Sequence, residues 1–249
     1  TDNPAMNPTN ADTPRPTVQW LDDDGAVQRA DWRSLAGHPP PAKVVLAGDD
    51  LGADAAYRLL AAGTGVLWLG DFQNARHLLQ ALGRRLDKRQ AKAGTRAASG
   101  LKEAFFAQRA AQAERARILG GVLLPFDADH SVPLRRAPDV RAASLQAHGP
   151  VAAHYVQSLR ELLGLVSAFE WRRKGVHIPA LGAAIHPHHG VFSPVRGEYV
   201  DLVAQAPLPA AALAQGAFDI GTGTGVLAAV LARRGLAAVA TDLSPTTLA

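Results

Sequence analysis

The sequence has 249 residues, 47% of them hydrophobic and 19% charged, and its formal net charge is +4 at neutral pH. This composition is typical of a globular protein of one or two domains, and it excludes collagen-like, coiled-coil and wholly disordered chains. The apolar runs are much shorter than the ~20 residues that span a bilayer, and the lack of cysteine excludes disulfides, thiolate metal sites and a cysteine nucleophile. The chain shows no secretory pattern, so we expect a cytoplasmic protein.

The first part of the chain divides into a tail and a domain. Residues 1–17 are rich in proline, asparagine, threonine and aspartate, which predicts a disordered tail. Over residues 18–150, short apolar runs alternate with helical patterns. The predicted strands and helices are, in chain order, 44–46, 53–62, 66–69, 72–86 and 122–124. Because this alternation is typical of βαβ units, we predict an N-terminal α/β recognition domain with mixed helical content.

The positive charge of the chain is concentrated in this domain. Between Arg76 and Arg117 there are eleven lysines and arginines and three acids, a net charge of +8, which leaves −4 for all other residues. Charge gathered on one element builds a local potential that a dispersed excess does not. Segment 76–117 therefore suggests contact with RNA or a ribosome-associated protein. The alternative is an ordinary solvated helix in an arginine-rich protein.

A helical connector is expected over residues 151–182. The predicted helix extends from about Val151 to Trp171, and its apolar side chains have helical spacing. They are Leu159, Leu162, Leu163, Val166 and Phe169. Short extended stretches between Val176 and Val195 then predict a hairpin, and helical character resumes over residues 196–204.

Three further groups of residues are weaker candidates for sites. Four histidines lack a nearby acid at a suitable spacing, so we expect no metal site; they are His177, His186, His188 and His189. The acids that follow two predicted strands are interpreted as caps of the next helix rather than as ligand loops; they are Asp49, Asp50 and Asp71. Of the tryptophans, Trp68 is predicted to be in the core, whereas Trp171, followed by three cations, is a candidate platform for stacking a base.

The most informative segment runs from Phe218 to Leu243. Its pattern is strand, glycine loop, helix, strand and acid, with glycines at 221, 223 and 225 and with Asp242 after the second strand. Glycines let the backbone turn sharply near a ligand, the helix start presents free N–H groups, and a carboxylate after the second strand accepts hydrogen bonds from ribose hydroxyls. The segment therefore predicts a site for a nucleoside-bearing cofactor.

Two classes of cofactor compete for this pattern. Gly223-x-Gly225-x-x-Ala228 fits the dinucleotide fingerprint, with Asp242 as the ribose contact, and this keeps a nicotinamide-dependent oxidoreductase as an alternative. However, Asp219 lies just before the loop, where its charge would repel a diphosphate. A cofactor with a cationic sulfonium and a free amino group would instead be attracted to that carboxylate.

The same residues resemble a known family. Asp219 to Gly225, followed by Thr241-Asp242-Leu243-Ser244-Pro245, resembles the first two motifs of class I S-adenosylmethionine-dependent methyltransferases. The nearest group is the small-domain one, which includes glutamine-amide and ribosomal RNA base methylases, and Gly190 to Pro194 resembles the short segment that helps cover the cofactor there. The resemblance implies an incomplete Rossmann-like domain over residues 183–249. The residues it implies as cofactor-binding are Asp219, Gly221, Thr222, Gly223, Gly225, Asp242 and Leu243.

The chain also departs from the family. The Asn/Asp-Pro-Pro-aromatic motif, which positions the nitrogen to be methylated, is absent from these residues, and the sequence ends just after Asp242, before the seven strands of such a domain are complete. We therefore expect a portion of a longer chain, inactive alone, with its catalytic residues downstream of residue 249.

The sequence thus predicts an S-adenosylmethionine-dependent methyltransferase. Its expected acceptor is an amide or exocyclic amino nitrogen of RNA or of a ribosome-associated protein. The alternatives are a non-catalytic nucleotide- or partner-binding module and a nicotinamide-dependent oxidoreductase.

Overall fold

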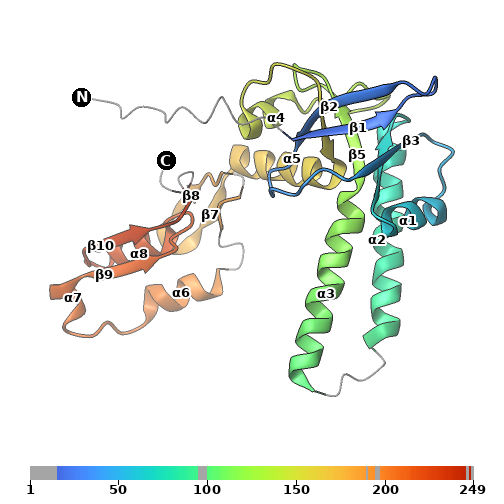
Figure 1. Ribbon diagram of the computed structural model, residues 1–249. Coiled ribbons are helices and arrows are strands. Elements are labelled where there is room, and N and C mark those ends of the chain that lie inside the picture. Colours follow the sequence, from blue (N-terminus) through green and yellow to red (C-terminus); the bar gives the residue numbers. More distant parts are fainter. Residues whose placement is uncertain (1–15, 95–99, 189, 194–196, 245–246, 248–249) are drawn as a thin grey trace. The chain divides into compact units, whose positions relative to one another are not determined.

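The structure is a computed structural model that describes residues 16–94, 100–188, 190–193, 197–244 and 247 (Figure 1). The chain forms two compact units, Thr1–Leu163 and Gly164–Ala249, which are described separately. The disordered tail predicted over residues 1–17 lies almost wholly outside the described residues, and Thr17 already begins a strand. None of the helices in the described ranges has both the length and the apolar character needed to cross a membrane.

The first unit contains one six-stranded mixed sheet with helices packed around it. The strands lie in the order β1-β2-β6-β5-β4-β3. The pairs β2/β6, β3/β4 and β4/β5 are parallel, whereas β1/β2 and β5/β6 are antiparallel. The elements are β1 Thr17–Leu21, β2 Val27–Arg33, β3 Lys43–Ala47, α1 Ala53–Ala61, β4 Thr64–Trp68, α2 Phe72–Gly94, α3 Leu101–Gly120, β5 Val122–Phe126, α4 Arg141–His148, β6 Tyr155–Ser158 and α5 Leu159–Lys174, the last of which continues into the second unit. The predicted α/β class is confirmed.

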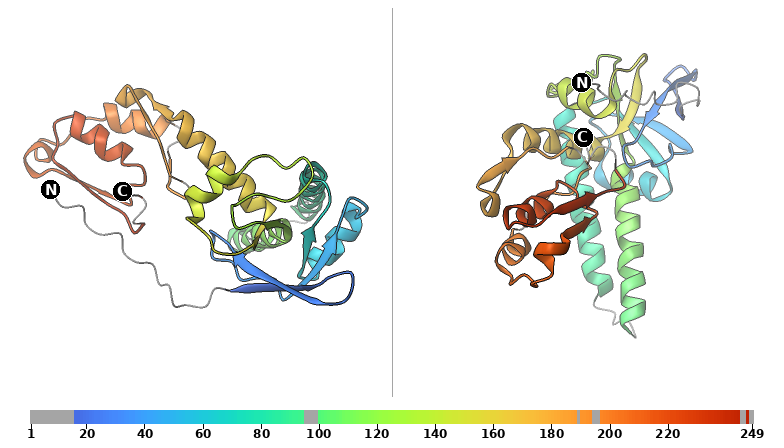
Figure 2. Two further views of the ribbon diagram at one scale, coloured as in Figure 1. Left: turned by 90° about the horizontal axis from the view of Figure 1, so that it is seen from above. Right: turned by 90° about the vertical axis from the view of Figure 1, so that its left-hand side faces the viewer.

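Burial explains why the central strands form. Every residue of β4 is buried, and so is nearly all of β5, as expected for strands covered on both faces. Trp68 is 1% exposed, which confirms its predicted place in the core. Helix α2 turns one apolar stripe inward at helical spacing, through Phe72, Ala75, Leu78, Leu82 and Leu86. Beyond the sheet, α2 and α3 run side by side as a helical hairpin (Figures 1 and 2).

The connector region differs from its prediction. The helix expected from Val151 begins only at Leu159, because Tyr155–Ser158 forms β6, a fully buried strand between β2 and β5. The helical prediction for residues 155–158 is therefore wrong. The division between the two units also falls within α5, after Leu163, rather than at residue 150.

The acids that follow β3 and β4 act as structural groups. Asp71 accepts a hydrogen bond from the N–H of Gln73 at the start of α2, as predicted for a helix cap. Its side chain is fully buried and pairs with Arg136 at 2.6 Å and with Arg135 at 3.0 Å. The hydrogen bond from Arg136 holds the pKa of Asp71 well below its usual range. Asp49 instead accepts a hydrogen bond from the N–H of Asp71 and so joins the loops that follow β3 and β4. The prediction that Asp49 or Asp50 caps the next helix is wrong, because α1 begins after Gly52 without a side-chain cap.

The second unit is smaller and contains two two-stranded sheets. β7 and β8 form an antiparallel hairpin, and β9 and β10 pair in parallel. Its core consists of Ile178, Val200, Val226 and Val230. The elements after α5 are β7 Val176–Ile178, the 3-10 helix η1 Pro179–Leu181, β8 Ala183–Ile185, α6 Glu198–Gln205, α7 Ala212–Gln215, β9 Ala217–Ile220, α8 Val226–Arg233 and β10 Ala238–Thr241. The predicted hairpin is present. The helix expected over residues 196–204 corresponds to α6, which begins at Glu198, and residue 196 lies outside the described residues.

Candidate functional site

The candidate site lies where β9 and β10 end side by side in the second unit. The two strands pair in parallel, with Asp219 opposite Ala240 and Ile220 opposite Thr241. Because the carboxyl ends of parallel strands meet at one edge, the glycine loop after β9 and the acid after β10 come together there. Helix α8 follows the loop and covers this small sheet.

The backbone fixes the glycine loop to the second strand. The N–H groups of Gly221 and Thr222 both donate to the carbonyl oxygen of Thr241, at 2.8 and 2.9 Å. Three glycines of the loop have positive φ angles, 75° at Gly221, 55° at Gly223 and 72° at Gly225. Such angles are strained for residues with a side chain, so the sequence needs glycine at these turns.

Asp242 joins the second strand to the loop. Its Oδ2 accepts a hydrogen bond from the N–H of Gly223 at 3.0 Å, and its Oδ1 accepts one from the N–H of Ser244 at 2.8 Å. These backbone donors lower the pKa of Asp242, the one from Ser244 most strongly. The carboxylate is therefore ionised at neutral pH, and the side chain of Thr247 is a further hydrogen-bond donor to it.

Asp219 occupies the start of α8. Its Oδ2 accepts hydrogen bonds from the hydroxyl of Thr222 at 2.6 Å and from the N–H of Ala228, the third residue of the helix, at 3.1 Å. The side chain thus caps the helix from the preceding strand and places a negative charge at the positive end of the helix dipole. This arrangement leaves Oδ1 available to a further donor.

A segment from outside the two strands lies against the loop. The carbonyl oxygen of Phe192 accepts a hydrogen bond from the N–H of Thr224 at 3.2 Å. The backbone of Gly223 passes so close that a Cβ there would lie 2.8 Å from the same oxygen. Phe192 therefore contacts the glycine loop, whereas Pro194 lies outside the described residues.

The described residues at this edge form a small open hollow rather than a closed pocket. A hollow of about 130 Å³ lies beside the loop, lined by Val191, Thr224, Thr247 and residues 185–188. Small-molecule sites usually measure about 300–1,000 Å³. The hollow therefore takes only part of a nucleoside-bearing molecule. Leu243, predicted to contact the cofactor, is fully exposed next to Asp242 and offers an apolar surface.

Of the other candidates, His186 and His188 line the hollow beside the loop. The Nδ1–H of His186 donates to the carbonyl oxygen of Arg172 at 2.6 Å. Burial, with a smaller contribution from Arg172, lowers the pKa of His188. His189 is not described, and in the part of the chain that is described no three metal-ligating side chains gather. Trp171 is 44% exposed on α5.

Tyr199 is a neighbour of the site that the sequence analysis did not single out. It lies on α6 and packs against the core of the second unit. Burial and, second to it, the charge of Asp219 raise the pKa of its phenol, which places the ring within electrostatic reach of that carboxylate. The only sequence signal for it was the helical spacing of apolar residues over 199–204.

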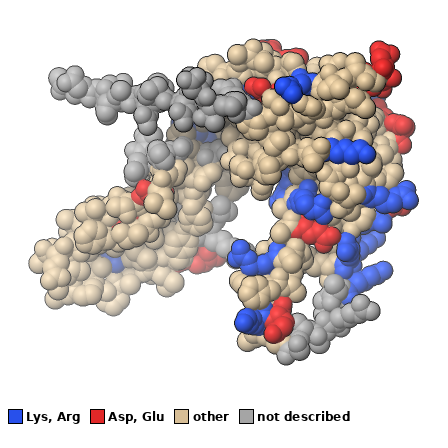
Figure 3. Space-filling model, viewed as in Figure 1, with Lys and Arg blue, Asp and Glu red and all other residues tan. Residues whose placement is uncertain are grey.

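The basic segment lies in the first unit, on the α2–α3 hairpin. Figure 3 shows lysine and arginine side chains along its surface with acids among them. Several of the arginines are paired, and Arg117 donates to the carbonyl oxygens of Leu60 and Ala61. The ion pairs are Arg85–Asp54, Arg89–Glu114 and Arg115–Asp87. Part of the +8 charge therefore stabilises the hairpin, and Arg96 lies outside the described residues.

Comparison with known proteins gives no match, either to a protein-family model or to a curated protein. The site is therefore interpreted from its residues and geometry.

Proposed function

We propose that this protein is an S-adenosylmethionine-dependent methyltransferase and that the β9–β10 edge binds the cofactor. The proposal combines the resemblance of residues 219–225 and 241–245 to the family's motifs with the parallel pairing of the strands that carry them. The glycine loop would lie beside the methionine part and the ribose, and Asp242 would accept hydrogen bonds from the ribose hydroxyls.

The observation that carries the proposal is the hydrogen bond from the N–H of Ala228 to Asp219. In dinucleotide-binding folds, the start of the equivalent helix binds the diphosphate. Here a carboxylate already occupies that position, and a diphosphate beside it would be repelled. A sulfonium and an ammonium group would instead be attracted, which favours S-adenosylmethionine over a nicotinamide dinucleotide.

The residues present fit the adenosyl group chemically. Asp242 is ionised and oriented by the N–H groups of Gly223 and Ser244, so its carboxylate is preorganised to accept a hydrogen bond from a ribose hydroxyl. When bound, the cofactor supplies an electrophilic methyl group. Its thioether leaving group needs no proton, so the protein contributes mainly alignment and exclusion of water.

The proposed acceptor is an amide or exocyclic amino nitrogen of RNA or of a ribosome-associated protein. The support is the basic α2–α3 hairpin, because phosphate contacts need clustered cations. No described residue is assigned as the catalyst. The nitrogen-positioning motif of the family does not occur in this sequence.

The test is a titration of the isotope-labelled protein, followed by backbone amide NMR, which detects weak as well as tight binding. S-adenosylhomocysteine should shift the amides of Gly221, Gly223, Gly225 and Asp242. Asp242→Ala should weaken binding roughly 10- to 100-fold, because charge-assisted hydrogen bonds to the ribose are lost. Asp201→Ala, an exposed change on α6, is the matched control and should leave binding unchanged.

NADH is the comparison ligand. If NADH shifts these amides at lower concentration than S-adenosylhomocysteine does, the oxidoreductase alternative replaces this proposal. If neither ligand shifts them, the site does not bind a nucleoside cofactor.

A further inference from the structure

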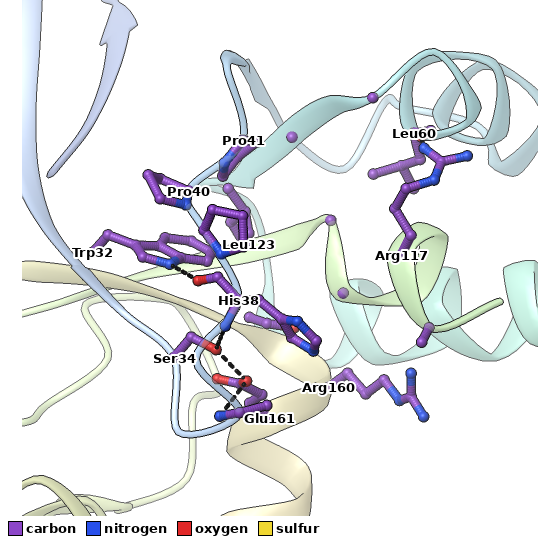
Figure 4. Close-up of a pocket in the computed structure, with 18 of the residues that line it drawn as sticks. Trp32, Ser34, His38, Pro40, Pro41, Leu60, Arg117, Leu123, Arg160 and Glu161 are labelled. Carbon is purple, nitrogen blue, oxygen red and sulfur yellow. Dashed lines mark hydrogen bonds between the residues drawn. The ribbon is translucent and has the colours of Figure 1, made fainter. Parts of the chain in front are cut away.

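The first unit contains a cavity of about 540 Å³, well within the size range of small-molecule sites. It lies at the end of the sheet where β3, β4 and β5 begin and β6 ends. Its walls come from the loop 34–41, the C-terminal ends of α1 and α3, and the start of α5 (Figure 4). All of these residues belong to the first unit, so the cavity is separate from the β9–β10 edge.

One wall is apolar and rigid. Trp32, 7% exposed, and Leu123, fully buried, belong to the core and line the cavity together with Leu60 and the consecutive prolines 39–41. The indole N–H of Trp32 donates to the carbonyl oxygen of His38 at 2.7 Å, which fixes the ring (Figure 4). A preformed apolar wall binds a flat or ring-containing body with little reorganisation.

Glu161 holds the loop that closes this wall. Its carboxylate accepts hydrogen bonds from the hydroxyl of Ser34 at 2.7 Å and from the N–H groups of Leu35 and Ala36 at 3.3 Å. Figure 4 shows this carboxylate directed at Ser34. Glu161 is the only acid among the described residues that line the cavity, and its carboxylate is occupied by these hydrogen bonds.

A polar group lies beside this apolar wall, because Ser158 is the register partner of Leu123 in the β5/β6 pair. Ser158 lines the cavity, is 4% exposed, and its Oγ has no hydrogen-bond partner among the described residues. A buried hydroxyl without a partner is unfavourable, so a ligand that reaches it is stabilised. Ser158 immediately precedes α5, a 16-residue helix whose first N–H groups have no partner within the helix. Glu161 lies in the first turn of this helix and offsets its positive end, so the hydroxyl of Ser158 is the group here that favours a hydrogen-bond acceptor.

Two arginines add positive charge at the rim. Arg160 and Arg117 both line the cavity and are exposed, and Arg117 uses two of its donors on the carbonyl oxygens of α1. Within the described ranges, the guanidinium of Arg160 forms no hydrogen bond or ion pair. The two arginines of the lining outnumber its one carboxylate, Glu161, so the lining carries a net positive charge.

We propose that this cavity binds a small organic anion that has an apolar, ring-containing body and one carboxylate, sulfonate or phosphate group. The body lies against Trp32 and Leu123. The anionic group meets Ser158 and Arg160. This site is independent of the methyltransferase proposal.

The test uses 8-anilinonaphthalene-1-sulfonate, a fluorescent probe with this chemistry, on the full chain, with neutral N-phenyl-1-naphthylamine as the uncharged comparison. The sulfonate should bind with 1:1 stoichiometry and more tightly than the neutral compound. Arg160→Gln should weaken binding of the sulfonate by about three- to tenfold, because a charge-assisted contact is lost, and leave the neutral compound unaffected. Ser158→Ala should also weaken the sulfonate only, without lowering the stability of the fold, since its hydroxyl has no partner to lose.

Ala116 and Ala110, both on α3, provide the location control. Ala116 lines the cavity, whereas Ala110 is exposed and does not. Ala116→Trp should lower the affinity of both compounds by about tenfold or more, because the indole fills the space, and Ala110→Trp should change neither. Unchanged melting temperatures would show that both variants fold.

The exposed side chains of β9 are the competing binding surface for such a probe. Phe218 is 73% exposed, and Phe218→Ser removes its ring without touching the cavity. Binding that survives Phe218→Ser and is lost in Ala116→Trp supports the proposal. Loss of binding in Phe218→Ser overturns it. So does an equal affinity of the sulfonate for the two tryptophan variants, or an equal affinity of the protein for the two compounds.

Discussion

At the scale of single residues, the three glycines of the loop after β9 are not equivalent. All have positive φ angles, so any of them resists replacement by a residue with a side chain. Only at Gly223 would a Cβ also meet another backbone, because the carbonyl oxygen of Phe192 lies 2.8 Å from its ideal position. At Gly221, nothing lies within 4 Å of that position. Replacing Gly221 therefore introduces backbone strain alone, whereas replacing Gly223 introduces both backbone strain and a steric clash.

Gly223→Ala should accordingly destabilise the second unit more than Gly221→Ala does. Alanine in the left-handed region costs about 1–2 kcal/mol at either position. Gly223→Ala must in addition displace Phe192, which breaks the hydrogen bond between Thr224 N–H and the Phe192 carbonyl. Urea unfolding measures the first effect, and amide exchange of Thr224 measures the second. Equal losses of stability, with Thr224 equally protected in both variants, would contradict the role given to this contact.

The positions of the two acids of the candidate site, Asp219 and Asp242, could be predicted from the sequence only in part. The spacing of Asp219, the glycines and Asp242 predicted that they would meet at one sheet edge, and they do. It did not predict that Asp219 would cap α8 through Ala228, because that bond depends on how the loop folds back. Tyr199 was missed for a similar reason, since only tertiary packing brings α6 near Asp219.

At the scale of elements, the α2–α3 hairpin divides into a packed part and an exposed part. Near the sheet, Leu82, Ile118 and Leu119 are buried, and arginines pair with acids. Every residue of α3 from Leu101 to Ala110 is exposed, including Phe105 and Phe106. Arg109 lies over the ring of Phe105 at 5.7 Å. Cations beside exposed aromatic rings are the combination that binds single-stranded nucleic acid.

Replacing the exposed cations of the hairpin should therefore weaken RNA binding in a salt-dependent way. The triple variant Lys88→Gln, Lys102→Gln, Arg109→Gln should reduce the slope of log affinity against log salt by about 2, since each phosphate contact contributes about 0.7 on single strands. Fluorescence anisotropy with labelled RNA between low and high salt measures this slope.

A matched triple variant elsewhere in the first unit serves as the control. Lys43→Gln, Arg29→Gln and Arg58→Gln remove the same charge outside the hairpin. An equal change of slope in both variants would mean that net charge, not the hairpin, drives binding.

The strands that the sequence analysis missed have a common physical cause. Strand β2 alternates, but its buried face contains only Ala30 and Trp32, too little for a clear period-two signal. Strand β6 is four residues long and wholly buried, so it has no alternation at all. Val156 lies three residues before Leu159, which is a helical spacing. The sequence pattern therefore predicted that the helix begins before Leu159. Strands β4 and β5 were predicted because glycine or proline lies at the ends of their apolar runs.

At the scale of the whole molecule, the two units differ in how well they bury their sheets. All of β4 is buried in the first unit, whereas β9 and β10 contain no fully buried residue. Phe218 and Ile220 are 73% and 76% exposed. Local opening is governed by buried apolar contacts, so the units should open with different free energies.

Hydrogen exchange of the whole chain should therefore show two levels of protection. Amides of β4 and β5 should exchange slowest, and those of β9 and β10 at least about tenfold faster, which corresponds to a difference of ~1.4 kcal/mol in opening free energy. A ligand stabilises only the state that binds it. S-adenosylhomocysteine should thus slow exchange in β9, β10 and the glycine loop alone, and 8-anilinonaphthalene-1-sulfonate should slow it around the cavity of the first unit alone. Two results would show that the chain opens as one cooperative body. One is equal protection of the amides in the two units, and the other is a ligand that slows amide exchange equally in both units.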